Sequence, residues 1–141
     1  MSSFPGPYRT VQEIYARSIA AYPDRTAFRR RIDKDRRSAS VPGRPVPIER
    51  RSPSTGKTSV YENWTYAQVD GWVSRLTGAI LDLGMAQGDR VAILSDNRPE
   101  WGIAFFAIIS VGGIAVPLDR SLNSFEIETV LNHSQARYIV A

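Results

Sequence analysis

The 141-residue sequence predicts an α/β protein built on an incomplete doubly wound parallel sheet of βαβαβ order, preceded by a helix and a peripheral β-hairpin. Three observations lead to this fold class. Helix-opening patterns recur along the chain, short apolar runs without strict polar alternation lie between the predicted helices, and the two kinds of segment alternate through the C-terminal half. Such alternation is typical of a parallel sheet covered by helices on both faces.

Four predicted helices begin with the same capping pattern. A side-chain oxygen at the N-cap accepts a hydrogen bond from the backbone N–H three residues later, and the side chain at that later position reaches back. We expect the first helix to end at Pro23, which cannot continue it. The four capping pairs are Thr10 with Glu13, Thr65 with Gln68, Asn97 with Glu100, and Asn123 with Glu126.

The second and third helices differ in how their apolar residues are distributed. The second has one apolar stripe at three-four spacing and ends at Gly84, so it is predicted to be amphipathic. The third is apolar on nearly all sides and ends at Gly112, so we expect it to lie buried between a sheet and other parts of a larger protein. The stripe of the second helix consists of Val69, Trp72, Val73, Leu76, Ala79, Ile80 and Leu83.

Short apolar runs predict the strands. Residues 90–95, 113–117 and 137–141 are predicted to form the parallel sheet, and residues 25–31 and 59–64 to pair as the peripheral hairpin. The last predicted strand runs to Ala141 without a turn or cap. Because the far edge of such a strand would be unpaired, we expect the sequence to be a fragment of a longer domain.

Composition limits the chemistry that the chain can carry. The hydrophobic fraction is 43% and the charged fraction 23%, as in ordinary globular proteins. The sequence has no cysteine and one histidine, His133, which excludes disulfides, cysteine nucleophiles and multi-histidine metal sites. No signal peptide is visible, and the longest strongly apolar run, 101–111, is too short to span a bilayer. We therefore expect a cytoplasmic protein, with peripheral contact to the inner face of the membrane left open.

The net charge of +4 is concentrated in one region. Residues 29–57 contain ten basic and three acidic residues, a charge of +7, whereas the rest has eight basic and eleven acidic residues, a charge of −3. We interpret residues 29–58 as a basic, proline-containing loop or hairpin insertion that is solvated. The alternative is a patch that binds anionic lipid or nucleic acid. No aromatic residue lies between Arg29 and Val60 to stack on bases, so no nucleic-acid partner is expected.

Several residues resemble functional ones but have simpler explanations. The segment 51–58 resembles a phosphate-binding loop at its Gly-Lys-Thr end, but it lacks the first glycine, a preceding buried strand and a following helix, so a hairpin turn is predicted. His133 is predicted to lie near a helix end in a capping or surface role. Asp89 is predicted to form a turn and Glu100 to cap a helix, and no role is assigned to Asp96. Trp72 and Trp101 are predicted to pack in the core.

Five segments, in order and at family spacing, resemble the AMP-forming acyl-CoA synthetases. Residues 64–69 resemble the "TYxEL" helix opening, 83–93 the "LGxxxGDRVAI" turn and strand, and 97–101 the "NxPEW" helix start. Residues 112–118 resemble "GAIxVPL", with Gly113 in place of the usual alanine, and residues 126–127 and 134–137 continue the likeness. The resemblance covers residues 60–141, and residues 1–59 match loosely. The Asn-Arg-Pro-Glu-Trp form is most similar to the long-chain fatty acid–CoA ligase branch.

This resemblance implies that residues 1–141 are the N-terminal part of the large domain of such a ligase. The full-length enzyme would use ATP and Mg²⁺ to convert a fatty acid to an acyl-adenylate, which the CoA thiolate then attacks. The family's phosphate loop, nucleotide contacts and catalytic lysine all lie downstream of this region. We therefore assign no catalytic, cofactor-binding or metal-binding residue here, and we expect no cofactor to bind this fragment and no activity from it alone.

Two further expectations complete the interpretation. Within the superfamily, an aryl-CoA ligase or a peptide-synthetase adenylation domain is the alternative to a fatty acid–CoA ligase. The fragment is also expected to self-associate, because the strand at Ala141 and the all-round apolar third helix would expose surfaces meant to meet other polypeptide.

Overall fold

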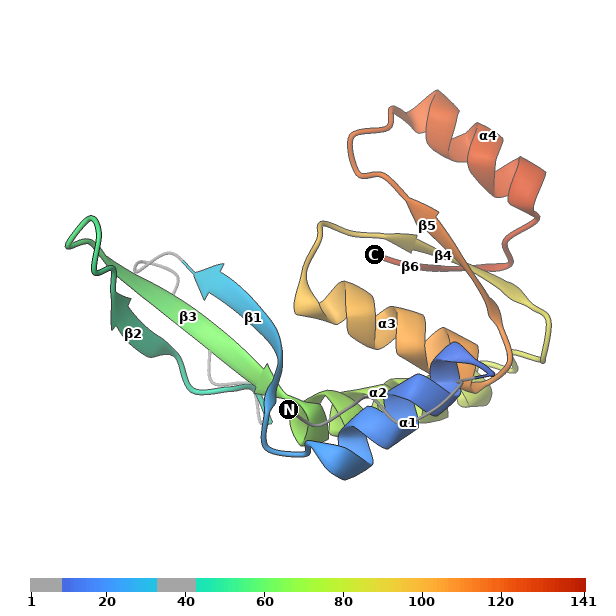
Figure 1. Ribbon diagram of the computed structural model, residues 1–141. Coiled ribbons are helices and arrows are strands. Elements are labelled where there is room, and N and C mark those ends of the chain that lie inside the picture. Colours follow the sequence, from blue (N-terminus) through green and yellow to red (C-terminus); the bar gives the residue numbers. More distant parts are fainter. Residues whose placement is uncertain (1–8, 33–42) are drawn as a thin grey trace.

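The computed structural model describes residues 9–32 and 43–141, which form four helices and six strands in two sheets (Figure 1). Lys34, Arg36 and Arg37 of the basic segment lie outside the described residues. In chain order the elements are α1 (Val11–Ala21), β1 (Thr26–Ile32), β2 (Ile48–Arg51), β3 (Thr58–Thr65), α2 (Tyr66–Asp82), β4 (Arg90–Leu94), α3 (Pro99–Ser110), β5 (Ile114–Leu118), α4 (Ser124–Ser134) and β6 (Tyr138–Val140).

The C-terminal half is the predicted βαβαβ unit. Its three parallel strands have the order β5-β4-β6, with Val91 of β4 paired to Ala115 on one side and to Tyr138 on the other. The connection through α3 runs from β4 to β5, and the connection through α4 runs in the opposite direction from β5 past β4 to β6. Right-handed crossovers therefore place the two helices on opposite faces of the sheet. Figure 1 shows this arrangement, with α3 below the sheet and α4 above it. The fold class predicted from the sequence is confirmed.

The N-terminal half contains a three-stranded antiparallel sheet in place of the predicted hairpin. The order is β1-β3-β2, so the predicted pairing of residues 25–31 with 59–64 is confirmed and β2 is added on the far side of β3. All four residues of β2 are exposed, so this strand has no apolar face that a sequence pattern could reveal. Part of the segment predicted as a basic loop or hairpin is therefore a strand that pairs with β3.

Capping explains where three of the helices begin. The Thr65 hydroxyl accepts from the Gln68 N–H at 3.2 Å while the Gln68 side chain accepts from the Thr65 N–H at 3.0 Å, and α4 has the same reciprocal pair. At α1 only half of the pattern forms, because the Glu13 carboxylate accepts from the Arg9 N–H at 3.1 Å instead of from the N-cap. The reciprocal prediction is thus confirmed for α2 and α4.

The capping prediction for α3 is wrong. The helix begins at Pro99, its N-cap is Arg98, and no side chain caps it. Proline suits the first helical position because it has no N–H to leave unsatisfied and its φ is already helical. That preference moves the helix start one residue beyond the position that Asn97 would cap. Glu100 is then the second residue of the helix, which is too early to close a capping box. Its carboxylate forms ion pairs with arginines instead.

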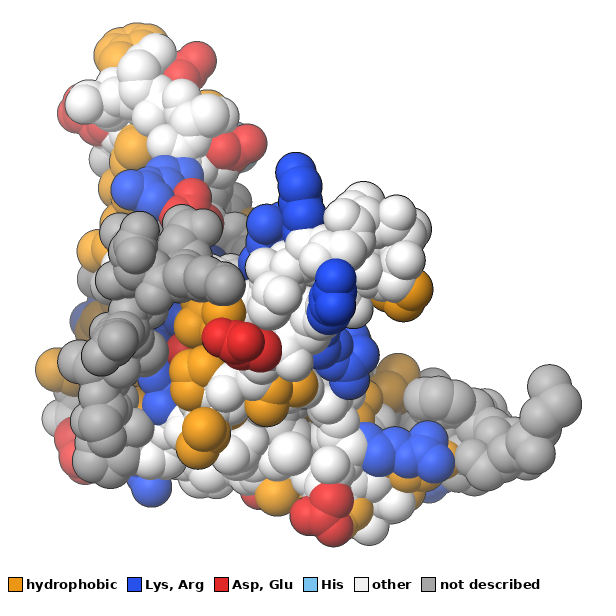
Figure 2. All heavy atoms as spheres, turned by 90° about the vertical axis from the view of Figure 1, so that its left-hand side faces the viewer, with side chains coloured by type: hydrophobic (Ala, Val, Ile, Leu, Met, Phe, Trp, Pro, Cys, Tyr) orange, Lys and Arg blue, Asp and Glu red, His pale blue; other side chains and the backbone are white. Residues whose placement is uncertain are grey.

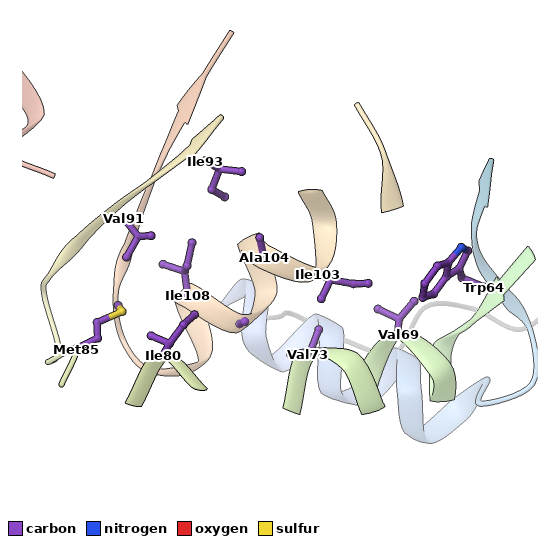
Figure 3. Close-up of a cluster of buried hydrophobic side chains, with 11 residues drawn as sticks. Trp64, Val69, Val73, Ile80, Met85, Val91, Ile93, Ile103, Ala104 and Ile108 are labelled. Carbon is purple, nitrogen blue, oxygen red and sulfur yellow. The ribbon is translucent and has the colours of Figure 1, made fainter. Parts of the chain in front are cut away.

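The core lies on both sides of α3 (Figure 3). Val91 and Ile93 of β4 point toward Ile108 on one side of α3, and buried residues of α2 lie on the other side. This placement confirms that α3 is buried against a sheet, as its all-round apolar character predicts. The buried residues of the cluster are Trp64, Val69, Val73, Ile80, Met85, Val91, Ile93, Ile103, Ala104, Ala107 and Ile108.

Packing also explains why glycine stands at position 113. A methyl group there would overlap the Cε atom of Met85 and would lie 3.0 Å from the Ile108 carbonyl oxygen. Met85 is 5% exposed, so its side chain already fills the space that an alanine would take. Gly113 and Met85 therefore form a matched pair in this core.

Candidate functional site: an arginine–glutamate cluster

A fully buried carboxylate marks the centre of the most highly charged internal region. Glu62 of β3 has 0% exposure, and its Oε2 accepts from Arg30 Nη2 at 2.7 Å. The two residues are directly opposite each other in the antiparallel pairing of β1 and β3. A buried carboxylate without such a partner would be costly, so the cross-strand guanidinium makes this position tolerable.

Glu100 extends this pair into a cluster at the start of α3. Its Oε1 accepts from Arg44 at 2.6 Å, from Arg30 at 3.4 Å and from Arg98 at 3.5 Å. Arg30 thus contacts both glutamates and connects the antiparallel sheet to α3. We call Arg30, Arg44, Glu62, Arg98 and Glu100 the Arg–Glu cluster.

The environment of Glu100 favours its ionised form. Partial burial is the largest influence on it and by itself would raise the pKa. Its own backbone N–H and the positive charges of Arg30, Arg98 and Arg44 act in the opposite direction and prevail. The pKa of Glu100 is therefore lower than that of an ordinary glutamate. A carboxylate shared among three guanidiniums is suited to holding elements together and poorly suited to taking up a proton.

Sequence reasoning missed this cluster, although one signal for it was present. Val60, Glu62 and Trp64 alternate along one face of β3, where the last of them is buried at 2% exposure. A carboxylate in the middle of such a face predicts a buried basic partner. The partner itself could not be chosen, because ten basic residues lie in the neighbouring segment 29–57.

The carboxylates identified in the sequence are dispersed. Asp89 shapes the turn before β4, because its carboxylate accepts from the Ala86 N–H at 2.9 Å and from Arg137 at 3.1 Å. The hydrogen bond from the Ala86 N–H is the largest reason that the pKa of Asp89 lies below its usual value. Loss of hydration acts in the opposite direction, and the hydrogen bond and charge of Arg137 lower the pKa further. The predicted turn role is confirmed. Asp96 pairs with Arg120 in an exposed ion pair.

The remaining predicted positions also have structural explanations. His133 is exposed in the last turn of α4, as predicted. Trp72 and Trp101 are partly buried against the core, and Trp101 stacks on Phe105 at a centroid distance of 5.6 Å. Residues 52–57 form the turn between β2 and β3, in which the Gly56 N–H donates to the Ser52 carbonyl. A strand follows where a phosphate-binding loop needs a helix, which confirms the hairpin-turn prediction.

The described residues offer no metal site. Within residues 9–32 and 43–141, no three histidine, cysteine, aspartate or glutamate side chains are grouped so that they could hold an ion. In the same residues, no helix has the combination of length and hydropathy that a membrane span needs.

Comparison with known proteins gives similar sequences and similar folds. The chain is 33% identical over 76 residues to the long-chain-fatty-acid–CoA ligase FadD13 of Mycobacterium tuberculosis, which is 54% of this chain and 15% of that protein. Among solved structures, the N-terminal subdomain of Klebsiella oxytoca NpsA in complex with 3-hydroxyanthranilyl-AMSN has a TM-score of 0.67 and 23% identity, covering 94% of this chain and 26% of that one.

A third protein shares the fold. The anthranilate CoA ligase AuaEII in complex with anthranoyl-AMP has a TM-score of 0.66 and 23% identity over 96% of this chain and 20% of its own. The chain thus spans a small part of each protein that it resembles. The family model described as AMP-binding enzyme matches residues 16–141. On that match over most of its length, this chain belongs to the AMP-binding enzyme family.

Proposed function

We propose that this chain is the N-terminal scaffold segment of the large domain of an AMP-forming acyl-CoA ligase and that it is inactive alone. The observation that carries the proposal is the family match over residues 16–141, together with a fold that corresponds to 26% of the NpsA subdomain. Several of its charged side chains form ion pairs within and between elements, as expected of a scaffold. The predicted absence of catalytic, cofactor-binding and metal-binding residues from this segment stays a prediction.

A long-chain fatty acid is our proposed substrate for the longer enzyme. FadD13, the relative described above, is a long-chain-fatty-acid–CoA ligase, and the Asn-Arg-Pro-Glu-Trp helix start supports the same branch. An aryl-CoA ligase or a peptide-synthetase adenylation domain is the alternative, since AuaEII has a similar fold. ATP, Mg²⁺ and CoA would be bound by other parts of the enzyme. The residues described here do not fit them, because they include no acidic cluster for Mg²⁺ and no phosphate loop.

Binding of anionic lipid or nucleic acid by residues 29–57 is less well supported. Arg30 and Arg44 are paired with glutamates, and Arg29 donates to Asn63 at 2.9 Å. Figure 2 shows blue basic side chains spread over the face that it presents, with hydrophobic and acidic ones between them. Because several basic side chains of this segment are already bonded within the fold, we propose a cytoplasmic scaffold role first and peripheral membrane contact second.

Pyrophosphate release tests the activity. The 141-residue chain and a longer polypeptide containing it would be assayed with ATP and Mg²⁺ against palmitate, anthranilate and an amino acid. We expect the longer polypeptide to release pyrophosphate fastest with palmitate and the 141-residue chain to release none above background. Turnover by the short chain would contradict its inactivity, a preference for anthranilate would contradict the fatty acid, and a gene that stops after codon 141 would contradict the scaffold role.

We also propose that the isolated chain self-associates. Ile114 on β5 and Ile139 on β6 are 48% and 51% exposed on strands at the two edges of the parallel sheet, where unpaired backbone groups invite further strands. Light scattering at micromolar concentration should give a mass above that of one chain. A clean monomer under these conditions would be evidence against the proposal.

A further inference from the structure

The antiparallel sheet has a face that points away from the core and carries three arginines. Successive side chains of a strand point to opposite faces of the sheet. On β1, Arg30 is turned toward the core, where it contacts the buried Glu62. Its two neighbours, Arg29 and Arg31, are exposed and therefore lie on the opposite face, which we call the outward face.

The register of the strands extends the outward face over β3 and β2. Tyr61 of β3 is paired with Arg31 on one side and with Ile48 of β2 on the other. Arg50 lies two residues beyond Ile48 and is paired with Ser59, so its side chain belongs to the same face. Ile48 is 37% exposed, and Tyr61 is partly buried. The outward face thus has arginines on both of its edge strands, with Tyr61 on the strand between them.

The charges of these three arginines are not neutralised within the part of the chain that the structure describes. Arg29 donates to Asn63 at 2.9 Å, and this partner is a neutral amide. Neither Arg31 nor Arg50 forms an ion pair with a carboxylate of the described residues. Glu49 is adjacent to Arg50 in β2, so its side chain belongs to the inward face. The described strands therefore place only basic charge on the outward face.

Two more basic residues lie at the free end of the sheet. Arg51 and Lys57 flank the turn between β2 and β3, and both are exposed. Arg51 donates to the Gly56 carbonyl at 3.2 Å, and neither residue forms an ion pair with a described carboxylate. This end of the sheet extends away from the parallel sheet (Figure 1). The three arginines and these two residues form a basic cluster of the size, about four to eight residues, that is typical of segments that bind anionic lipid.

The chemistry of the outward face fits a lipid surface better than a nucleic acid. Tyrosine is suited to the boundary between water and lipid, because its ring is apolar and its hydroxyl is polar, and guanidiniums bind phosphate groups. A nucleic acid would need several rings on which its bases could stack, and Tyr61 is the one aromatic side chain of the described strands on this face.

We propose that the outward face and the adjoining turn lie against a membrane surface that contains anionic lipid. The arginines would bind the lipid phosphates, and Tyr61 and Ile48 would lie between the headgroups. This inference rests on the proposed function, because it names the surface that makes the peripheral membrane contact.

Vesicle binding by the full-length protein that contains this chain tests the proposal. Arg31→Gln/Arg50→Gln removes two charges from the outward face, and Arg31→Lys/Arg50→Lys keeps them. The matched control is Arg9→Gln/Arg90→Gln, which removes two exposed arginines outside the antiparallel sheet. Cosedimentation would be measured with vesicles of equal parts phosphatidylserine and phosphatidylcholine and with vesicles of phosphatidylcholine alone. Binding to duplex DNA would be measured in parallel.

We expect the protein to bind the vesicles that contain phosphatidylserine and not those of phosphatidylcholine alone. Each basic residue near an anionic surface contributes about fivefold to binding, so the double glutamine variant should bind about 25-fold more weakly, and the lysine variant should bind within about threefold of the parent. The control should also stay within about threefold, because charges farther from the membrane than the Debye length of about 10 Å are screened. Raising the salt concentration to about 1 M shortens that length to about 3 Å and should release the protein.

Several outcomes would overturn the proposal. They are a failure to distinguish the two kinds of vesicle, equal losses for the glutamine variant and its control, a lysine variant as weak as the glutamine variant, and binding to duplex DNA at least as tight as to the anionic vesicles. Pyrophosphate release without vesicles tests the ligase proposal separately. An active enzyme that does not distinguish the vesicles would refute the outward-face proposal alone, and an inactive protein with the expected vesicle binding would refute the ligase proposal alone.

Discussion

Replacing Arg30 with methionine should lower the free energy of unfolding by about 3–5 kcal/mol, the typical cost of removing one partner from a buried ion pair. Arg30 is the residue that pairs with Glu62, which has no exposure at all, and it also contacts Glu100. Methionine keeps much of the side-chain length, so the main change is an uncompensated buried carboxylate. Since a domain is stable by only about 5–15 kcal/mol, this loss would be visible in chemical denaturation.

Two controls separate charge from packing in this experiment. The double variant Arg30→Met/Glu62→Leu removes both charges and should regain much of the lost stability, because no buried charge is then left alone. Arg29→Met alters the neighbouring residue, whose side chain is exposed and bonded to the neutral Asn63, and should change stability by less than about 1 kcal/mol. If Arg30→Met and Arg29→Met had equal effects, the Arg–Glu cluster would not be a principal link between the antiparallel sheet and α3.

Replacing Ile108 with alanine should lower the free energy of unfolding by about 2–5 kcal/mol. Ile108 has 0% exposure and lies on α3 between β4 and α2, so its removal leaves a cavity where the two layers meet. The neighbours that would have to close that cavity include Val91 and Ile80, which belong to separate elements and are fixed by their own packing. Urea denaturation with a two-state fit would measure the loss.

The matched control is Ile139→Ala on β6. The residue type is the same, but Ile139 is 51% exposed, so less apolar surface is returned to water and no closed cavity forms. The expected loss is below about 1 kcal/mol. Equal losses for the two variants would show that α3 does not form the centre of the core in solution.

The sequence predicted local features well because their causes lie within a few residues. The reciprocal caps of α2 and α4 join positions three apart, so the pairs Thr65 with Gln68 and Asn123 with Glu126 could be recognised directly. The parallel strands could be recognised from short apolar runs, because each run lies within a single strand and does not depend on the choice of neighbour. The failure at α3 has an equally local cause, since Pro99 prefers the first helical position and makes Arg98 the N-cap.

The sequence by itself determined the order of the helices and of every described strand except β2, the parallel βαβαβ unit and the family resemblance, because each depends on short-range patterns. Only the tertiary structure decided the place of β2 and the Arg–Glu cluster. The cluster joins residues that are 32, 56 and 70 positions apart in the chain. All four residues of β2 are exposed, so no apolar pattern in the sequence marks this strand. Many arginines could have reached Glu62 and Glu100. Which of them did so follows from how the antiparallel sheet packs against α3, and that packing is a property of the whole fold.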